Sequence, residues 1–379
     1  LPTIHPSSFI DADTELADDV VIGPWCCVNG RVKIGAGCRL IGNVYLRLSG
    51  NNPRLRQGQG FDLRPYRSQL RSEVLLELGH SDNPEGEDMK LTIATCQFPV
   101  SSDIERNFRY VSRQLRLAHE RGAELLHFSE ACLGGYVGVD VDSFEDYPWD
   151  LLRELTQEIL ELTSSLKLWV VLGSNHQLSG KHKPHNSLYV VNPRGQIVDR
   201  YDKMFCTGDR SGKKDDLSHY SPGSRFVMFK VKGIRCGLQI CHDFRYPELY
   251  REYNRKGAQL VLHSYHNGGM NPETKKEYQN VWAVLVRATM QAYAGSNHLW
   301  ISVNNTTRRE SSGSSFLVRP DGLVASTLPL HRAGVLIHTI DTEADYYDAS
   351  KDWRRRALRG IYHSGRLVQD RRSADRTCL

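Results

Sequence analysis

Long apolar runs are missing from this chain of 379 residues. Its longest apolar stretch, 168–172, falls far short of the roughly 20 residues that a membrane-spanning helix needs. No basic-then-apolar leader opens the chain either. We therefore expect a cytoplasmic protein without a membrane partner.

Paired cysteines and a strong excess of one charge are also missing. The nine cysteines form no Cys-x-x-Cys pair and their number is odd, which favours reduced thiols over a disulfide framework or a metal site. Lysine and arginine exceed aspartate and glutamate by 49 − 44 = 5. Part of this surplus lies in the Arg-rich segment 346–379, which has few aromatic residues and no nucleic-acid-binding signature. We expect an interaction tail there and no nucleic-acid partner.

A period of six runs through the first 46 residues. Neither the helical period near 3.6 nor the strand period of 2 accounts for it, whereas hexapeptide repeats are typical of a parallel β-helix. The run also resembles the N-terminal coils of the acyltransferase that acylates UDP-N-acetylglucosamine in lipid A synthesis, but it stops before the coils that carry that family's catalytic histidine. We expect a short left-handed β-helix fragment at 1–46, and an acyltransferase fragment is a rival function. The aliphatic positions of the repeat are Ile4, Ile10, Leu16, Ile22, Val28, Ile34, Leu40 and Leu46.

Residues 47–88 are mainly polar and contain several Gly, Pro and Asn residues, which is typical of a linker. The first methionine, Met89, comes just before a strand-like run. We interpret 1–88 as a fused or read-through fragment. A complete enzyme would then begin at Met89, with 89–345 as one large domain before the tail at 346–379.

From Met89 onward, short apolar runs alternate with helical stretches. Helices between strands, with some hairpins, predict an α/β layered sandwich. A hairpin is expected where the turn NPRG separates two strand-like runs, 187–191 and 196–201. The other expected strands are 91–98, 125–128, 168–172, 225–231, 235–240, 260–263 and 299–303, and the expected helices are 104–121 and 149–165.

Three ionisable side chains follow such strands: Glu130, Lys203 and Cys241. Cys241 stands between an apolar strand and a proline-bearing turn, a position where a nucleophile and an oxyanion site can share one turn. Taken singly, Cys241 is equally well a small core residue, and Glu130 or Lys203 a solvated strand end. Polar groups at the mouth ends of separate strands can converge on one pocket in an α/β sandwich, so we expect these three to meet.

The segments around these residues resemble the nitrilase superfamily of carbon-nitrogen hydrolases. The matching stretches are HFSEACLGGY, NSLYVVNPRGQIVDRYDK and CGLQICHDFRYPELYR. The pattern Cys-x-Asp-x-Arg-x-Pro-Glu, from Cys241 to Glu248, is highly specific, and the resemblance extends over nearly all of 89–379. The chain departs from the usual family pattern at Ser129 in place of proline, His242 in place of an aromatic residue, and Asp216 in place of glutamate.

This resemblance implies a four-layer α-β-β-α sandwich for 89–345, the carbon-nitrogen hydrolase domain, with Glu130, Lys203 and Cys241 as the catalytic triad. It also implies a homodimer or a larger homo-oligomer, with the tail at 346–379 in the contact. The substrates of the family are small molecules. Amides and N-carbamoyl amides are favoured over nitriles because they are the broader chemistry of the family.

The chemistry of the three groups fits this assignment. A thiol with a pKa of about 8.5 is mostly protonated at neutral pH, so Cys241 needs a base, for which Glu130 is the candidate. Lys203 and the backbone N–H of His242 would stabilise the developing negative charge, typically worth about 3 kcal/mol per donor. Glu130 would then protonate the leaving amine and activate water to hydrolyse the thioester. Neither a metal nor another cofactor is needed.

Other residues near the expected sheet edge have supporting roles in this interpretation. Asp216 and His242 are expected to support the triad, and Asp243 to pair with Arg245 at the turn. The spacing of His263 and His266 fits a metal in principle, but no carboxylate or cysteine nearby completes the site, and packing is the favoured role. A catalytically inactive scaffold with the same fold is the second rival. The expected pocket residues are Tyr136, Tyr265, His266 and Asn267.

Overall fold

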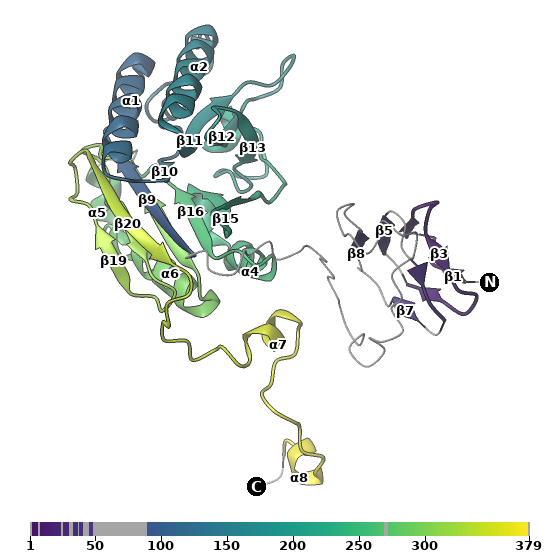
Figure 1. The fold of residues 1–379 in the computed structure, drawn as a ribbon. Coiled ribbons are helices and arrows are strands. Elements are labelled where there is room, and N and C mark those ends of the chain that lie inside the picture. The colour runs from purple at the N-terminus through teal and green to yellow at the C-terminus, as the bar shows by residue number, and fades with distance from the viewer. Residues whose placement is uncertain are drawn as a thin grey trace. The chain divides into compact units, whose positions relative to one another are not determined.

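The structure is a computed structural model that describes residues 2–6, 8–23, 26–29, 33–36, 38–40, 45–47, 89–268 and 272–377. The chain divides into two compact units, Leu1–Glu87 and Asp88–Leu379. The linker expected at 47–88 lies almost entirely outside the described residues. Figure 1 shows the fold of both units.

Short parallel strands make up the described part of the N-terminal unit. They form three small sheets with the orders β1-β4-β7, β2-β5-β8 and β3-β6. Each pairing joins one hexad position to the hexad position three repeats later, as Ile4 does with Ile22 and Leu16 with Ile34. The strands are β1 (Thr3–Ile4), β2 (Phe9–Ile10), β3 (Glu15–Leu16), β4 (Val21–Ile22), β5 (Cys27–Asn29), β6 (Lys33–Ile34), β7 (Arg39–Leu40) and β8 (Tyr45–Arg47). The buried apolar residues are Val20, Ile22, Cys26, Val28, Ile34, Cys38 and Leu40.

One six-stranded sheet of the C-terminal unit has the order β13-β12-β11-β10-β9-β20. Its three central strands β9, β10 and β11 are parallel, whereas β12, β13 and β20 run antiparallel to their neighbours. The parallel pairs require crossover connections, which α1 and α2 supply. The bounds are β9 (Lys90–Gln97), α1 (Ile104–Glu120), β10 (Leu125–Phe128), α2 (Trp149–Leu166), β11 (Trp169–His176), β12 (His185–Val191), β13 (Ile197–Asp202) and β20 (Gly334–Asp341).

The second six-stranded sheet has the order β14-β15-β16-β17-β18-β19. Here too the parallel strands are β15, β16 and β17, with α4 and α6 as crossovers, and the remaining strands are antiparallel. The bounds are β14 (Met228–Val231), β15 (Ile234–Ile240), α4 (Pro247–Arg255), β16 (Leu260–Ser264), α6 (Val281–Asn297), β17 (Trp300–Asn304), β18 (Phe316–Val318) and β19 (Val324–Thr327).

Three apolar cores separate four layers in this unit. Helices α1 and α2, side by side in Figure 1, pack on the first sheet, and α4 and α6 pack on the second. Between the two sheets lies a third core. Strand β9 contributes to two of the cores because its side chains alternate: Leu91 and Ile93 face the second sheet, whereas Ala94 and Cys96 face the helices. The α/β fold is therefore as expected, with the layer order α-β-β-α.

None of the helices that the structure describes is long and apolar enough to cross a bilayer.

The expected hairpin is present as β12 and β13. Strands β18, β19 and β20 were not expected, because their short or half-exposed segments carry weak periodicity. The short helices are α3 (Asp216–His219), a 3-10 turn at Cys241–Arg245, α5 (Pro272–Glu277), α7 (Arg354–Leu358) and α8 (Arg371–Ala374).

Candidate active site

Glu130 lies just beyond the end of β10 and is fully buried. Its Oε1 accepts hydrogen bonds from the ammonium of Lys203 at 2.9 Å and from Asn186 Nδ2 at 2.8 Å. Among the described residues, none donates a hydrogen bond to its other oxygen, Oε2. One oxygen of the carboxylate is thus held in place, and the other is free to take a proton.

Strand β11 runs close to this segment, and a glycine makes the approach possible. A Cβ at Gly173 would clash with the carbonyl oxygen of Ser129, the residue before Glu130. Ala131, the residue after it, has a φ of 48°, in the left-handed region that is uncommon outside glycine. The backbone around Glu130 is therefore sharply turned and tightly packed, which fixes the carboxylate.

Lys203 directly follows β13, and its side chain is buried between two carboxylates. Its Nζ lies 2.9 Å from Glu130, 2.7 Å from Asp216 and 3.1 Å from the hydroxyl of Tyr136. Burial lowers the pKa of Lys203, but the charges of these neighbours outweigh burial and raise its pKa well above the ordinary value. The site therefore holds a permanent ammonium group.

Asp216 reaches Lys203 although it is one methylene shorter than glutamate. Its carboxylate also accepts a hydrogen bond from the Tyr136 hydroxyl and another from the backbone N–H of Thr207 at 3.0 Å. Burial raises the pKa of Asp216, but Lys203 and these hydrogen bonds together lower it. Asp216 is thus an ionised second partner of the ammonium, beside Glu130.

Cys241 directly follows β15, where the strand turns into a 3-10 helix. Its φ is 42°, a left-handed conformation that is strained for a residue with a side chain. Burial, followed by the negative charge of Glu130, raises the pKa of the thiol well above its ordinary value, while Lys203 acts in the opposite direction. These shifts favour the neutral thiol form of Cys241 over the thiolate.

Asp243 fixes the turn that carries Cys241. Its Oδ2 accepts hydrogen bonds from the Tyr201 hydroxyl at 2.8 Å and the Ile240 N–H at 3.0 Å, and its Oδ1 accepts one from the Phe205 N–H at 2.8 Å. These bonds tie the turn that carries Cys241 to the segment that carries Lys203.

The expected ion pair between Asp243 and Arg245 is wrong. Asp243 is buried, whereas Arg245 is exposed and its guanidinium lies 4.8 Å from the centre of the Phe244 ring. Residues two apart in a helix with three residues per turn point in different directions, so the two side chains diverge.

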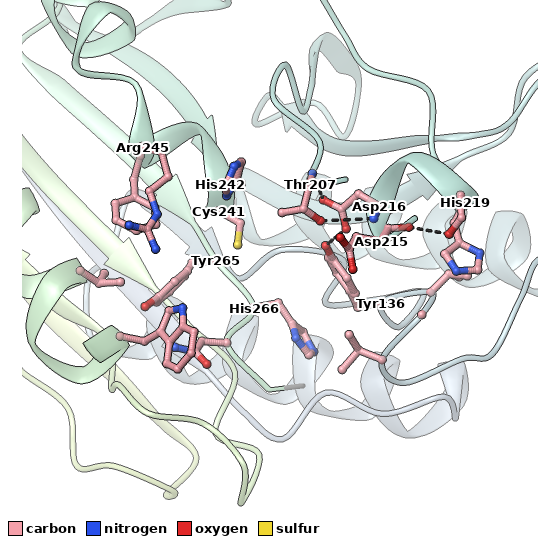
Figure 2. Close-up of a pocket in the computed structure, with 18 residues that line it drawn as sticks. Tyr136, Thr207, Asp215, Asp216, His219, Cys241, His242, Arg245, Tyr265 and His266 are labelled. Atoms are coloured by element: carbon pink, nitrogen blue, oxygen red, sulfur yellow. Dashed lines mark hydrogen bonds between the residues drawn. The ribbon is translucent and has the colours of Figure 1, made fainter. Parts of the chain in front are cut away.

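A cavity of about 530 Å³ opens over Cys241. Figure 2 shows the sulfur pointing toward the space between Tyr265, His266 and Tyr136. All four expected pocket residues line this cavity, as do both supporting residues. Glu130 and Lys203 are buried and are not among the lining residues, but both interact electrostatically with the Cys241 thiol. The lining includes Tyr136, Asp216, Cys241, His242, Tyr265, His266 and Asn267, and also Thr207, His219, Arg245, Trp282 and Val286.

Several residues of the site were not expected from the sequence. Asn186, which holds Glu130, is the second residue of β12 and begins the family-like stretch NSLYVVNPRGQIVDRYDK, of which only the final lysine was expected in the site. Trp282 and Val286 reach the pocket from α6, where their helical spacing is indistinguishable from that of core residues. No signal in the chain's periodicity could have assigned these residues to a site.

The histidines of the H-x-x-H spacing serve different purposes. His263 Nδ1 hydrogen-bonds the Tyr250 hydroxyl at 2.7 Å, and burial lowers the pKa of His263 to about 3. His266 instead pairs with Asp140. Within the described part of the chain, no cluster of His, Cys, Asp and Glu side chains suits a metal ion.

Known proteins that are similar to this chain identify its family. The carbon-nitrogen hydrolase family matches residues 92–346. The omega-amidase NIT2 of Bos taurus is 27% identical over 240 residues, which cover 61% of this chain and 82% of the relative. The chloroplastic omega-amidase of Arabidopsis thaliana is 26% identical over 265 residues, covering 66% of this chain and 68% of that protein.

Solved structures share the fold. An amidase from Nesterenkonia sp. is 21% identical, with a TM-score of 0.57, and covers 72% of this chain and 96% of its own. The Caenorhabditis elegans NitFhit protein is 22% identical, with a TM-score of 0.57, over 67% of this chain and 61% of that one.

Proposed function

Because the chain belongs to the carbon-nitrogen hydrolase family, we propose that it is an amidase that hydrolyses amide or N-carbamoyl amide bonds of small molecules through a thioester on Cys241. One observation carries this proposal. A buried ammonium, Lys203, lies between the carboxylates of Glu130 and Asp216, beside a cavity into which the Cys241 sulfur points. Buried charges are costly, and such a cluster next to a thiol is typical of a catalytic site.

In the first step, the Cys241 sulfur attacks the amide carbon while Glu130 Oε2 accepts the thiol proton. The raised pKa of the thiol and the free oxygen of Glu130 both support transfer during attack instead of a preformed thiolate. A C–S bond forms, and the carbonyl electron pair moves onto oxygen. The backbone N–H of His242 stabilises this oxyanion by about 3 kcal/mol. The ammonium of Lys203 assists through its charge, because its three N–H groups already contact Glu130, Asp216 and Tyr136.

In the second step, the C–N bond breaks and protonated Glu130 gives its proton to the departing amine. Water then enters, Glu130 removes a proton from it, and the resulting hydroxide attacks the thioester. When the C–S bond breaks, the sulfur regains its proton and the acid product leaves. Glu130 thus acts alternately as base and acid, which its single hydrogen-bonded oxygen and free second oxygen allow.

The relatives point to the same chemistry. Several are named omega-amidases, so a terminal amide is the first substrate to test. One solved variant of the Nesterenkonia amidase, 20% identical with a TM-score of 0.57, carries the acetamide moiety of fluoroacetamide covalently on its active-site cysteine. A corresponding cysteine adduct is what we propose for Cys241.

A hydrolysis screen tests this function. Small terminal amides, N-carbamoyl compounds and nitriles would be offered to the full chain, and ammonia release measured. We expect turnover of amides or carbamoyl compounds that disappears in Cys241→Ala and persists in Cys236→Ala, a buried cysteine of β15 that does not line the pocket. Turnover that survives Cys241→Ala would exclude the proposal.

The segments before and after the hydrolase domain carry two further proposals. We propose that 1–46 forms coils of a parallel β-helix, which the pairing of every third hexad supports. We also propose that 346–379 contacts a second copy of the chain, since it exposes several large apolar side chains. Light scattering on a chain ending at residue 345 would test this, with loss of the oligomer expected. The exposed side chains include Tyr347, Trp353, Tyr362, Leu367 and Val368.

A further inference from the structure

A second buried ion cluster lies beside the proposed triad. His266 Nε2 is 2.9 Å from Asp140 Oδ2, and neither side chain is exposed. Arg308 forms an ion pair with the other oxygen of Asp140. The three residues follow three different strands, β10, β16 and β17, so the fold assembles the cluster from distant parts of the chain.

The cluster is joined to the site through Tyr136. The Tyr136 backbone N–H donates to Asp140 Oδ2 at 2.9 Å, which fixes the carboxylate. The imidazole of His266 stacks on the Tyr136 ring, with the centres 5.1 Å apart and an angle of 22° between the planes. The Tyr136 hydroxyl in turn contacts Lys203 and Asp216. His266 also lines the cavity over Cys241 (Figure 2).

The charges of the two clusters complement one another. When Glu130, Asp216 and Lys203 are all ionised, their net charge is one negative charge. Asp140 with Arg308 is neutral; Glu310, which also pairs with Arg308 at 3.3 Å, is 42% exposed, so solvent screens its charge. Among the buried groups, a protonated His266 therefore adds the positive charge that balances the sum. An uncompensated buried carboxylate takes up a proton, and Glu130 would then be unable to act as a base.

We propose that His266, held by Asp140 and Arg308, is a positioning residue whose positive charge keeps Glu130 ionised and ready to accept the thiol proton. This inference rests on the proposed function. It assigns to His266 an electrostatic role in addition to its place in the pocket wall.

The directions of the pKa shifts agree with the geometry. Burial lowers the pKa of His266, but Asp140 and then Glu130 outweigh burial and raise it above the ordinary 6.5. Burial raises the pKa of Glu130 above its ordinary value; Lys203 is the strongest group that lowers it, and His266 adds a smaller effect in the same direction. The ionisable groups that face His266 are Asp140, Tyr136 and Glu130 from the segment after β10, Cys241 after β15, and Arg308 after β17. Lys203 and Asp216 also face Glu130.

The test is the pH dependence of kcat/KM, whose acid limb reports the base of the free enzyme. In His266→Gln we expect this limb to move to higher pH by less than about one unit, the lower end of the effect of a directly adjacent opposite charge, because His266 lowers the pKa of Glu130 less than Lys203 does. Asp140→Asn should move it in the same direction, because His266 loses the partner that keeps it charged. The limb staying in place in a folded His266→Gln variant would overturn the inference.

The chain offers a matched control. His298 lies 3.5 Å from Asp348, which pairs with Arg354, so the same three residue types meet outside the pocket. His298→Gln should leave the acid limb unchanged. If His266→Gln does not fold, Asp140→Asn decides alone: an upward shift of the limb is expected, because His266 loses its carboxylate partner, and an unmoved limb would again overturn the inference.

A second readout separates this inference from the proposed function. In selectively labelled protein, the His266 ring signal, assigned by its loss in His266→Gln, should titrate above 6.5 in the unaltered chain and at lower pH in Asp140→Asn. A chain that shows this titration but hydrolyses no amide would refute the proposed function alone. Amide turnover together with a His266 that is neutral at pH 6.5 would refute this inference alone.

Discussion

Replacing Glu130 by Gln tests the proposed base with little change in shape. The side-chain oxygen of Gln can still accept the hydrogen bonds that Asn186 and Lys203 now donate to Oε1. Its amide nitrogen takes the place of Oε2, the oxygen without a hydrogen-bond donor. This nitrogen cannot accept the thiol proton. The substitution therefore removes the base while retaining its anchors.

The expected loss is that of a general base, about 100- to 10,000-fold in kcat/KM. This corresponds to about 3–5 kcal/mol of transition-state stabilisation. The folded state should suffer less, by about 1–3 kcal/mol, because Asp216 still neutralises Lys203 at 2.7 Å. Activity is thus expected to fall much further than stability.

Ammonia release and thermal unfolding would be measured on the same preparations. Glu124→Gln is the control, because Glu124 also pairs with a lysine, Lys232, but at the surface. It should keep its activity. A folded Glu130→Gln enzyme that retains more than roughly a tenth of the wild-type kcat/KM would refute the assignment of Glu130 as the base.

Three further predictions concern other parts of the molecule. Tyr136→Phe removes the hydroxyl that Lys203 and Asp216 share. It should lower kcat/KM about 10- to 100-fold, the effect of a hydrogen bond to charged groups. An unchanged kcat/KM would show that this hydroxyl does not contribute to turnover. Burial raises the folded-state pKa of Asp243 from 3.8 to about 6, so its carboxyl favours folding at low pH, and this contribution is lost as the pH rises through about 6. The free energy of unfolding, measured by denaturant titration between about pH 3.8 and 6, should fall as the pH rises in the wild type but not in Asp243→Asn. Equal pH dependence in the two proteins would contradict this prediction. A chain that begins at Met89 should keep the wild-type kcat/KM, whereas lost activity in a folded truncation would assign the N-terminal unit a part in catalysis.

The main elements of the C-terminal unit are visible in the sequence because they are long and periodic. Helices α1 and α2 and the buried parallel strands carry regular apolar patterns. The positions of Glu130, Lys203 and Cys241 were accessible for the same reason, since each directly follows, or nearly follows, a recognisable strand. Strand ends predict where a polar group lies without any knowledge of its partners.

The partners themselves depend on how the loops pack. Asn186 of β12 contacts Glu130, and Asp140 contacts His266, although many residues separate the members of each pair in the sequence. Arg308 lies in a loop with no motif, yet it completes the buried ion cluster. Such contacts follow from tertiary packing, which local periodicity does not encode.

The central claim is that Cys241 carries the acyl group during turnover. The direct measurement is acid-quenched mass spectrometry of the full chain during hydrolysis of an amide found in the screen, followed by peptide mapping. We predict a mass increase equal to the acyl group on the peptide that contains Cys241, absent from Cys241→Ala. Steady turnover with no adduct in the wild type, and with undiminished rate in Cys241→Ala, would contradict the account.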